Sequence, residues 1–170
     1  MSQYDFLSDH HIVSGLTPVA DAFSGGVNTD VISLENYRRA TFIVFCGAYE
    51  DTGVSNLVTV EACDDASASN TSTMLFKHRH CASSATVDTW GALTTVSAVT
   101  GYNFTSNNTG SNGIWMVEVT ADEVAADGGN GYQFVRLAIA ETADKTITAG
   151  VLVILSDPRY PGAVPVSAIA

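Results

Sequence analysis

Histidine and cysteine side chains between residues 63 and 81 form the pattern in this sequence that could bind a metal ion. His78 and His80 are two positions apart, which places both imidazoles on one face of a strand, and Cys63 and Cys81 are the nearest thiols. A closed zinc site needs four ligands, however, and Cys81 projects to the face opposite the two histidines. The spacing therefore favours partly exposed strand histidines and buried thiols, and we expect no metal and no cofactor.

Two acidic segments resemble calcium-binding loops. They are the pair Asp64 and Asp65 and the Asp-Gly-Gly-Asn-Gly sequence at 127–131. Neither has the alternating acidic spacing of an EF-hand or its terminal bidentate glutamate. Asp and Asn tolerate left-handed backbone and glycine supplies positive φ, so turn formation is the favoured interpretation and calcium binding stays open.

Patterns for nucleophilic or phosphate chemistry are missing from the sequence. It contains no GxSxG elbow, and Ser24-Gly25-Gly26 lacks the lysine and helix of a phosphate-binding loop. His10 and His11 follow Asp9, but adjacent side chains diverge in an extended segment and are interpreted as surface residues. We predict no catalytic residues and no enzyme activity.

The composition narrows the possible partners. Of 170 residues, 46% are hydrophobic and only 15% are charged, and the net charge is −11. Direct nucleic-acid binding is not expected, because phosphate neutralisation requires clustered Lys and Arg. The three cysteines, an odd count, favour free thiols, and the polar N-terminal segment and short apolar runs predict neither a signal peptide nor a membrane span. Synthesis in a host cytoplasm is expected.

Strand patterns recur at regular intervals from residue 30 onward. The expected strands lie at residues 41–46, 57–62, 74–80, 93–99, 115–119, 135–139 and 151–155. Residues 41–46 and 151–155 are apolar at successive positions, which predicts central strands buried on both faces. Residues 121–126 have helical composition, and Thr120 with Glu123 predicts a capping box. The pattern predicts an all-β fold, an antiparallel β-sandwich or jelly-roll-like barrel with one short helical turn.

The ends of the chain differ from this central region. Residues 1–28 have no sustained period and are predicted to form an extended N-terminal arm with room for one short strand. Residues 29–157 form the expected β-sandwich domain. Residues 158–170 form a tail stiffened by three prolines, which makes it poor material for a further strand but less costly in entropy to immobilise on a neighbour.

Basic and aromatic residues near the strand ends are candidate contacts. Arg38 and Arg39 precede the apolar strand at 41–46 and could pair with an acidic neighbouring subunit, protect that strand from aggregation, or pair with a carboxylate of the same chain. Arg136 carries the same ambiguity. The candidate interaction residues are Arg38, Arg39, Pro158, Arg159, Tyr160 and Pro161.

Short motifs along residues 30–160 occur in an order that resembles a group of small proteins encoded among the head genes of tailed bacteriophages and prophages. The motifs are YRRA at 37–40, VTVEACDD at 58–65, FKHR at 76–79, DTWGA at 88–92, EVTADEV at 118–124, FVRL at 134–137 and LSDPRY at 155–160. Each motif alone is short, and the resemblance depends on their shared order.

The resemblance implies a virion structural protein, a capsid cement or decoration protein that binds and stabilises the shell of the major capsid protein. Such a protein would lie on the capsid surface and form a homo-oligomer, a trimer or a dimer, without direct nucleic-acid or membrane contacts. Two alternatives are a tail or baseplate component of the virion, and a module that binds host-surface glycans through Trp90, Trp115 and residues 101–113.

Overall fold

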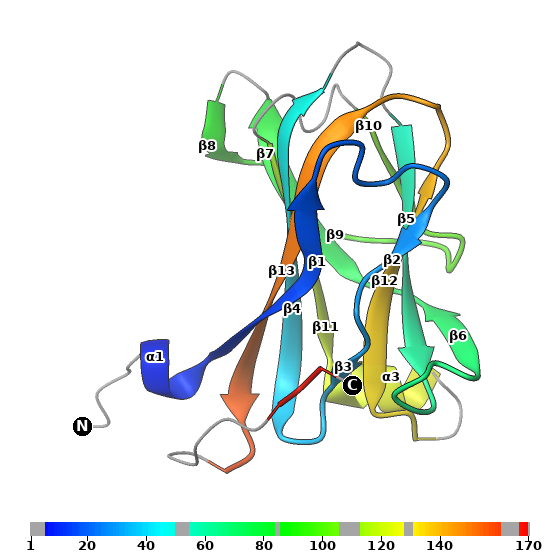
Figure 1. The fold of residues 1–170 in the computed structure, drawn as a ribbon. Helices are drawn as coiled ribbons and strands as arrows, with labels where there is room; N and C mark the ends of the chain where they lie inside the picture. The colour runs from blue at the N-terminus through cyan, green and yellow to red at the C-terminus, as the bar shows by residue number, and fades with distance from the viewer. Residues whose placement is uncertain are drawn as a thin grey trace.

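The chain folds into two antiparallel β-sheets that pack face to face (Figure 1). The structure, a computed structural model, describes residues 6–49, 55–83, 86–105, 113–127, 131–160 and 167–169. Pro161, the loop at 106–112 and the Gly-Gly-Asn segment at 128–130 therefore lie outside the described residues. The arrangement is the β-sandwich that the sequence predicts.

The larger sheet has seven strands, in the order β1-β13-β4-β11-β7-β8, with β9 also paired to β7. The bounds are β1 His11–Val19, β13 Ile147–Pro158, β4 Tyr37–Tyr49, β11 Ile114–Thr120, β7 Lys77–Ser83, β8 Thr86–Trp90 and β9 Thr94–Thr95. The longest strands, β4 and β13, pair along almost their whole length in the interior of this sheet. The C-terminal strand is thus central in its sheet, as its apolar sequence predicts.

The smaller sheet has six strands, in the order β10-β5-β12-β2, with β3 paired to β12 and β6 to β5. The bounds are β10 Tyr102–Thr105, β5 Ser55–Cys63, β12 Phe134–Glu141, β2 Val27–Asn28, β3 Ile32–Ser33 and β6 Thr71–Met74. Strands β5 and β12 are in register over eight residue pairs and alternate buried with partly exposed positions. This alternation is the pattern expected of a sheet with one covered face.

The core lies between the two sheets. Phe42, Val60, Trp115, Leu137 and Val153 are among the side chains that are completely buried there. Burying each large apolar side chain contributes about 1.5–3 kcal/mol, so this layer supplies most of the driving force for folding.

Helix α3 (Ala121–Asp127) follows β11 directly and lies across one end of the sandwich (Figure 1). Its N-terminus has the predicted capping box: the Thr120 N–H donates to Glu123 Oε2 at 2.8 Å, and the Glu123 N–H donates to Thr120 Oγ1 at 3.2 Å. Burial alone would raise the pKa of Glu123, but hydrogen bonds from Thr120 and Lys77 outweigh it and lower the pKa. A single helical turn, α1 (Phe6–Asp9), precedes β1.

The N-terminal segment differs from the predicted extended arm. Strand β1 pairs with β13 at the edge of the larger sheet, and β2 pairs with β12 in the smaller one. Between them, Phe23 is 1% exposed and packs in the core. The sequence of β1 lacks a regular alternation because the strand is bulged: its register with β13 shifts twice, around Gly15 and Pro18. The strand can contain a proline because it lies at the edge of the sheet.

Residues 74–80 form two strands instead of the single predicted one. Strand β6 belongs to the smaller sheet and ends at Met74, whereas β7 belongs to the larger sheet and begins at Lys77. Leu75 and Phe76 carry the chain from one sheet to the other, and Phe76 is buried. Similarly, only Thr94–Thr95 of residues 93–99 is a strand.

The prediction that residues 41–46 and 151–155 are buried on both faces is wrong. Phe42 and Val153 are completely buried, but Phe45 is 53% exposed and Leu152 is 48% exposed. An antiparallel sheet in a two-layer sandwich has one face against the core, and here the other face is not covered by the described residues.

The end of the C-terminal tail packs against its own sandwich. Ala168 is buried, its carbonyl accepts a hydrogen bond from the Ser33 N–H at 2.8 Å, and Ile169 forms a β-bridge with Ile32. Among the described residues, no helix is long and apolar enough to cross a membrane.

Candidate interaction surface

The outward side of the larger sheet carries a continuous set of apolar side chains, which we call the apolar face. Its members, on β1, β13, β4 and β11, are Ile12, Ile43, Phe45, Ile114, Met116, Leu152 and Ile154. Cross-strand partners share a face, and the pairing joins Leu152 to Ile43 and Ile43 to Met116 in one row. Phe45 pairs with Ile114 in the next row.

A hollow in the apolar face lies beside Phe45. It has a volume of about 240 Å³, and Leu16, Pro18 and Leu152 are among its walls. Gly47 on β4 leaves part of its floor without a side chain, whereas Gly150 on the neighbouring strand β13 lies beneath Pro18. A Cβ atom on Gly150 would lie 2.7 Å from Pro18 Cγ, so glycine is required for Pro18 to rest on the sheet.

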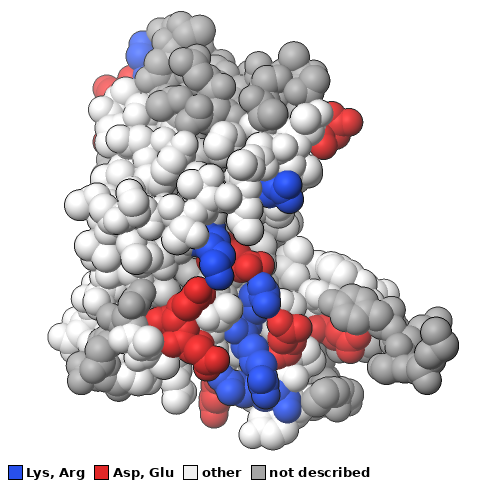
Figure 2. Space-filling view, turned by 180° about the vertical axis from the view of Figure 1, so that it is seen from behind, with Lys and Arg blue, Asp and Glu red and all other residues white. Residues whose placement is uncertain are grey.

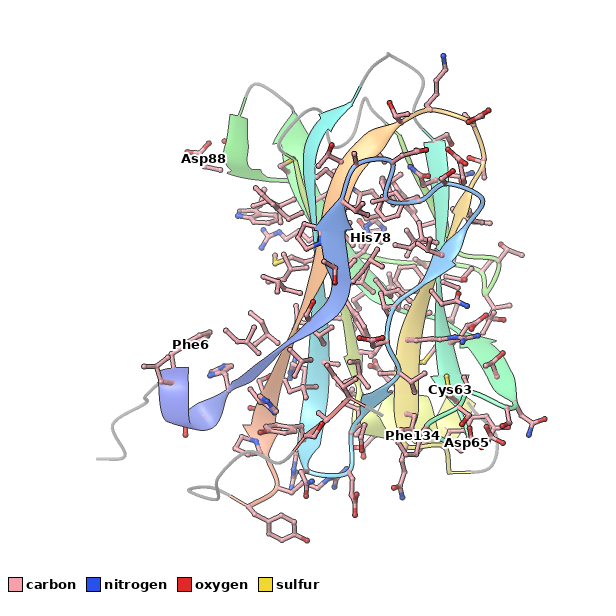
Figure 3. All side chains as sticks on the ribbon, in the orientation of Figure 1. Phe6, Cys63, Asp65, His78, Asp88 and Phe134 are labelled. Atoms are coloured by element: carbon pink, nitrogen blue, oxygen red, sulfur yellow. The ribbon has the colours of Figure 1, made fainter. Side chains whose placement is uncertain are left out.

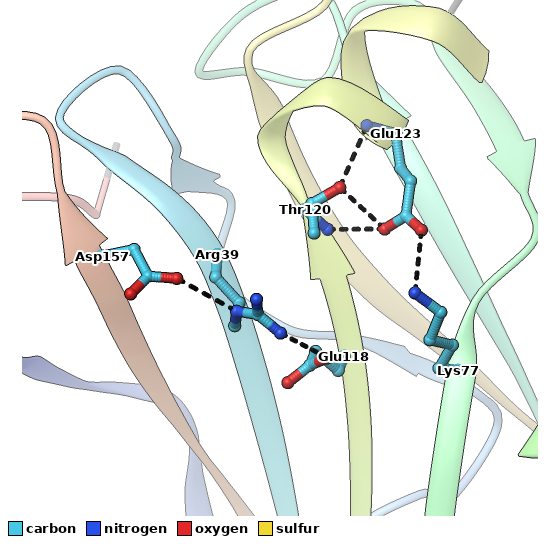
Figure 4. A network of polar contacts seen from close by, with 6 residues as sticks. All are labelled: Arg39, Lys77, Glu118, Thr120, Glu123 and Asp157. Carbon is cyan, nitrogen blue, oxygen red and sulfur yellow. Dashed lines mark hydrogen bonds and ion pairs between the residues drawn. The ribbon is translucent and has the colours of Figure 1, made fainter. Parts of the chain in front are cut away.

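Charged side chains occupy the adjoining part of the same face. Arg39 Nη1 lies 2.8 Å from Glu118 Oε1, and Arg39 Nε lies 3.3 Å from Asp157 Oδ2 (Figure 4). Lys77 Nζ lies 3.3 Å from Glu123 Oε1. The Glu118 carboxylate is the main cause of the raised pKa of Arg39. Figure 2 shows Lys and Arg side chains gathered on one side of the molecule, with Asp and Glu on both sides of them.

Two arginines that the sequence offers as partner contacts are paired within the chain. Arg39 bridges two carboxylates, and Arg136 Nε lies 2.7 Å from Glu61 Oε2 on the outward side of the smaller sheet. For both arginines, the structure contains the ion pair with a carboxylate of the same chain that was one of the three interpretations of the sequence. Arg38 is exposed at the start of β4.

The described candidate residues of the tail lie at the end of β13. Pro158 pairs with Tyr37, and the Arg159 N–H donates to the Asn36 carbonyl at 2.9 Å. The side chain of Arg159 is exposed, and Tyr160 is 67% exposed. Arg159 also lines a polar cleft of about 400 Å³, whose other walls include Glu35, Asp122 and Tyr132.

The histidines and cysteines of the candidate metal set are not brought together. His78 lies in the upper part of the sandwich and Cys63 in its lower part (Figure 3). The His78 ring lies 5.4 Å from the Trp115 ring, 4.1 Å from the Tyr102 ring and 6.0 Å from the His80 ring. No group of three or more His, Cys, Asp or Glu that could hold a metal occurs among the described residues.

Burial determines the ionisation of these groups. It lowers the pKa of His78, with a further contribution from His80, and it lowers the pKa of His80 itself. It raises the pKa of the Cys46 thiol to about 12 and that of Cys63 to about 11, so both thiols are protonated and unsuited to nucleophilic chemistry near neutral pH.

The loop of Asp64 and Asp65 uses its carboxylates for turn hydrogen bonds. Asp65 accepts from the Ser67 and Ser69 N–H groups at 2.9 and 3.1 Å, and Asp64 accepts from Asn70. These bonds to Asn70 lower the pKa of Asp64. The second acidic segment falls mostly outside the described residues.

Trp115 is completely buried between the sheets, and so it offers no surface for a glycan. Trp90 is partly exposed, and residues 106–112 of the proposed glycan loop lie outside the described residues. The sequence did not predict the apolar face, although Phe45 and Leu152 at outward positions of their strands were a signal for it.

The fold and these surfaces define a two-sheet β-sandwich with an open apolar face. No family model matches the chain, and no curated protein matches it. Among solved structures, it is similar to the SPBc2 prophage-derived protein YomS, with a TM-score of 0.43 and 11% identity over 88% of this chain and 94% of that one. A family two carbohydrate esterase from Cellvibrio japonicus gives a TM-score of 0.20 and 8% identity over 91% of this chain and 36% of the esterase.

Proposed function

We propose that this protein is a capsid cement or decoration protein, a virion structural protein that binds the shell of the major capsid protein. The observation that carries the proposal is the open apolar face of the larger sheet. Contiguous apolar surface on a protein marks an interaction site, and here it lies on the outward side of a sheet. This is the surface expected of an assembly component.

The motifs that resemble phage head proteins support the same class. Four of the seven motifs meet in the charged cluster of the larger sheet, because they contribute Arg39, Lys77, Glu118 with Glu123, and Asp157. Two further motifs are joined by the pair of Glu61 and Arg136. The resemblance therefore includes residues that hold strands of this sandwich together.

We assign the contact with the shell to exposed residues at the start of β4 and the end of β13. Arg38, Arg159 and Tyr160 are exposed there, and Tyr37 next to Arg38 pairs with Pro158. Tyr and Arg are enriched among the side chains that contribute most to binding at protein interfaces. The end of the tail contributes to the fold through Ala168, so point variants are better probes of this contact than truncations.

Co-sedimentation with shells assembled from the major capsid protein of the same phage tests the proposal. The wild-type protein should bind with a fixed number of copies per shell. The variant Arg159→Ala/Tyr160→Ala should lower occupancy by about 30-fold at a subsaturating concentration, because two anchor side chains are removed. Lys145→Ala, which removes a basic residue at the turn between β12 and β13, is the matched control and should bind as the wild type does.

A wild-type protein that binds no shells would contradict the proposal. If it instead co-sediments with purified tails, the protein belongs to the tail or baseplate. Full occupancy by the double variant would mean that the protein binds capsids, but not through Arg159 and Tyr160.

A further inference from the structure

The apolar face has a shape that can match itself. Phe45 projects from it with 53% of its area exposed, and the hollow over Gly47 lies directly beside that ring. A projection next to a depression is what a two-fold contact requires, because each copy then offers both halves of the same fit. A phenyl ring is of a size that a hollow of about 240 Å³ admits.

Charge selects a second copy of the chain as the occupant. The strands of the larger sheet carry charges of both signs in nearly equal number: four cations, Arg38, Arg39, Lys77 and Arg79, and three acids, Asp88, Glu118 and Asp157. The net charge of −11 therefore belongs to the rest of the chain. Two strongly acidic copies repel each other, and this sheet is the surface on which they meet with the least repulsion.

We propose that the apolar face binds a second copy of this chain by a two-fold contact, in which Phe45 of each copy enters the hollow over Gly47 of the other, beside Pro18. Leu152 and Ile43 lie against the partner's apolar face around the two rings. The ion pairs of Arg39 with Glu118 and Asp157 border the contact and remain hydrated. Sheets that pack in this way lie about 10 Å apart.

The size of the surface agrees with a stable pair. Four strands about 4.8 Å apart and about seven residues long give a face of roughly 19 by 23 Å. The relief of the side chains brings its accessible area to the order of 600 Å² per copy, which is the lower end for specific interfaces. A dimer with a micromolar dissociation constant is the expected strength.

This inference deepens the proposed function by naming the partner of one surface, and it leaves the start of β4 and the end of β13 to the shell. Self-association is measured on the purified protein without shells. The two proposals can therefore fail separately.

Sedimentation equilibrium over a range of protein concentrations is the test. The wild type should show a reversible monomer–dimer equilibrium. Phe45→Asp and Leu152→Asp should each weaken it by at least about 30-fold, because a two-fold contact contains every substitution twice and brings the new carboxylates near each other. Leu93→Asp, at a 65% exposed leucine outside the apolar face, is the matched control and should dimerise as the wild type does.

A double-mutant cycle tests the fit of the ring itself. A Cβ on Gly47 would approach Thr148 no closer than 3.4 Å, so Gly47→Ala is accommodated in the monomer but occupies the floor of the hollow. It should weaken the dimer by about tenfold in the wild-type background. In a Phe45→Ala background the same change should have almost no effect, because no ring enters the hollow.

Circular dichroism and thermal unfolding of every variant ensure that only folded proteins are compared. A wild type that is monomeric at its highest soluble concentration overturns the inference. This holds even if Phe45→Asp blocks binding to shells, because the apolar face would then contact the shell and not a second copy. A dimer that survives both Phe45→Asp and Leu152→Asp overturns it as well. Additive effects of Gly47→Ala and Phe45→Ala on dimerisation would contradict the claim that the Phe45 ring enters the partner's hollow.

Discussion

The outward faces of the two sheets differ in kind. On the smaller sheet the outward positions of β5 and β12 include Thr59, Glu61 and Arg136, and the last two form an ion pair. On the larger sheet the outward positions of β4 and β13 include Phe45 and Leu152. The first face is suited to water, whereas the second resembles half of a protein interior.

This difference separates two reasons for an apolar residue in a strand. Inward residues are apolar because the opposite sheet covers them, which stabilises the monomer. Outward residues of β4 and β13 gain little in the monomer, and their apolar character agrees with the proposal that another molecule covers them. Stability and association measurements on matched residues should separate the two roles.

Phe42 and Phe45 give the clearest comparison of an inward with an outward residue. They lie three residues apart on β4, and their exposed fractions are 0% and 53%. Phe42→Ala should lower the free energy of unfolding by about 3–5 kcal/mol, since it leaves a cavity between the sheets. Phe45→Ala should lower it by less than about 1 kcal/mol. Urea unfolding at low protein concentration, where dimers do not contribute, measures both values. Equal losses would mean that the chain itself covers Phe45.

The free energy of unfolding should fall at acid pH, because the two histidines His78 and His80 then become protonated. Burial lowers the pKa of His78 and His80 in the folded state below the value of about 6.5 that an unfolded chain has. The unfolded chain therefore binds more protons, and the stability that the two neutral imidazoles contribute is complete above pH 6.5 and is lost as the pH falls through their folded-state pKa values. A protonated His78 would bury a charge against Trp115 and Tyr102.

Urea unfolding between pH 8 and pH 5 follows this loss. His78→Phe should flatten the pH dependence, because it removes the most buried titrating group. His10→Phe, beside the helical turn α1, is the matched control and should keep the pH dependence of the wild type. A His78→Phe profile as steep as that of the wild type would place the pH sensitivity elsewhere.

Much of the sandwich was predictable because local patterns agree with the fold. The alternation of residues 57–62 and 135–139 predicts β5 and β12, and Thr120 with Glu123 predicts the start of α3. The crossing from β6 to β7 was not predictable, because Met74 and Phe76 keep the alternation while the strand changes sheets. Nor was β1, in which Gly15 and Pro18 interrupt the pattern.

The candidate surface was harder to predict than the fold. A continuous apolar run at 151–155 is typical of a strand covered on both sides, and the sequence does not specify whether the cover comes from the same chain. Arg39 likewise reads as a surface cation, and only the pairing of β4 with β11 and β13 places it between Glu118 and Asp157. Both features depend on contacts between residues far apart in sequence.

Substitutions on the outward face of the smaller sheet should cost more stability than is usual for surface residues. The pair of Glu61 and Arg136 is only 17% and 20% exposed, so removing one partner leaves the other partly desolvated. Arg136→Met, which keeps the aliphatic length, should lower the free energy of unfolding by about 1–2 kcal/mol. Glu61→Gln/Arg136→Met should cost less than the sum of the two single changes. Urea unfolding of all four proteins measures this coupling, and strict additivity would contradict it.

Arg39→Met should have the smallest effect, although Arg39 contacts two carboxylates where Arg136 contacts one. The Arg39 side chain is 39% exposed, and Glu118 and Asp157 are 33% and 53% exposed, so water screens both pairs. The expected loss is at most about 1 kcal/mol, and it should shrink further as salt is added. Urea unfolding at low and high salt measures it, with Arg136→Met as the less salt-sensitive comparison. A larger loss for Arg39→Met than for Arg136→Met would mean that the charged cluster of the larger sheet holds the monomer together.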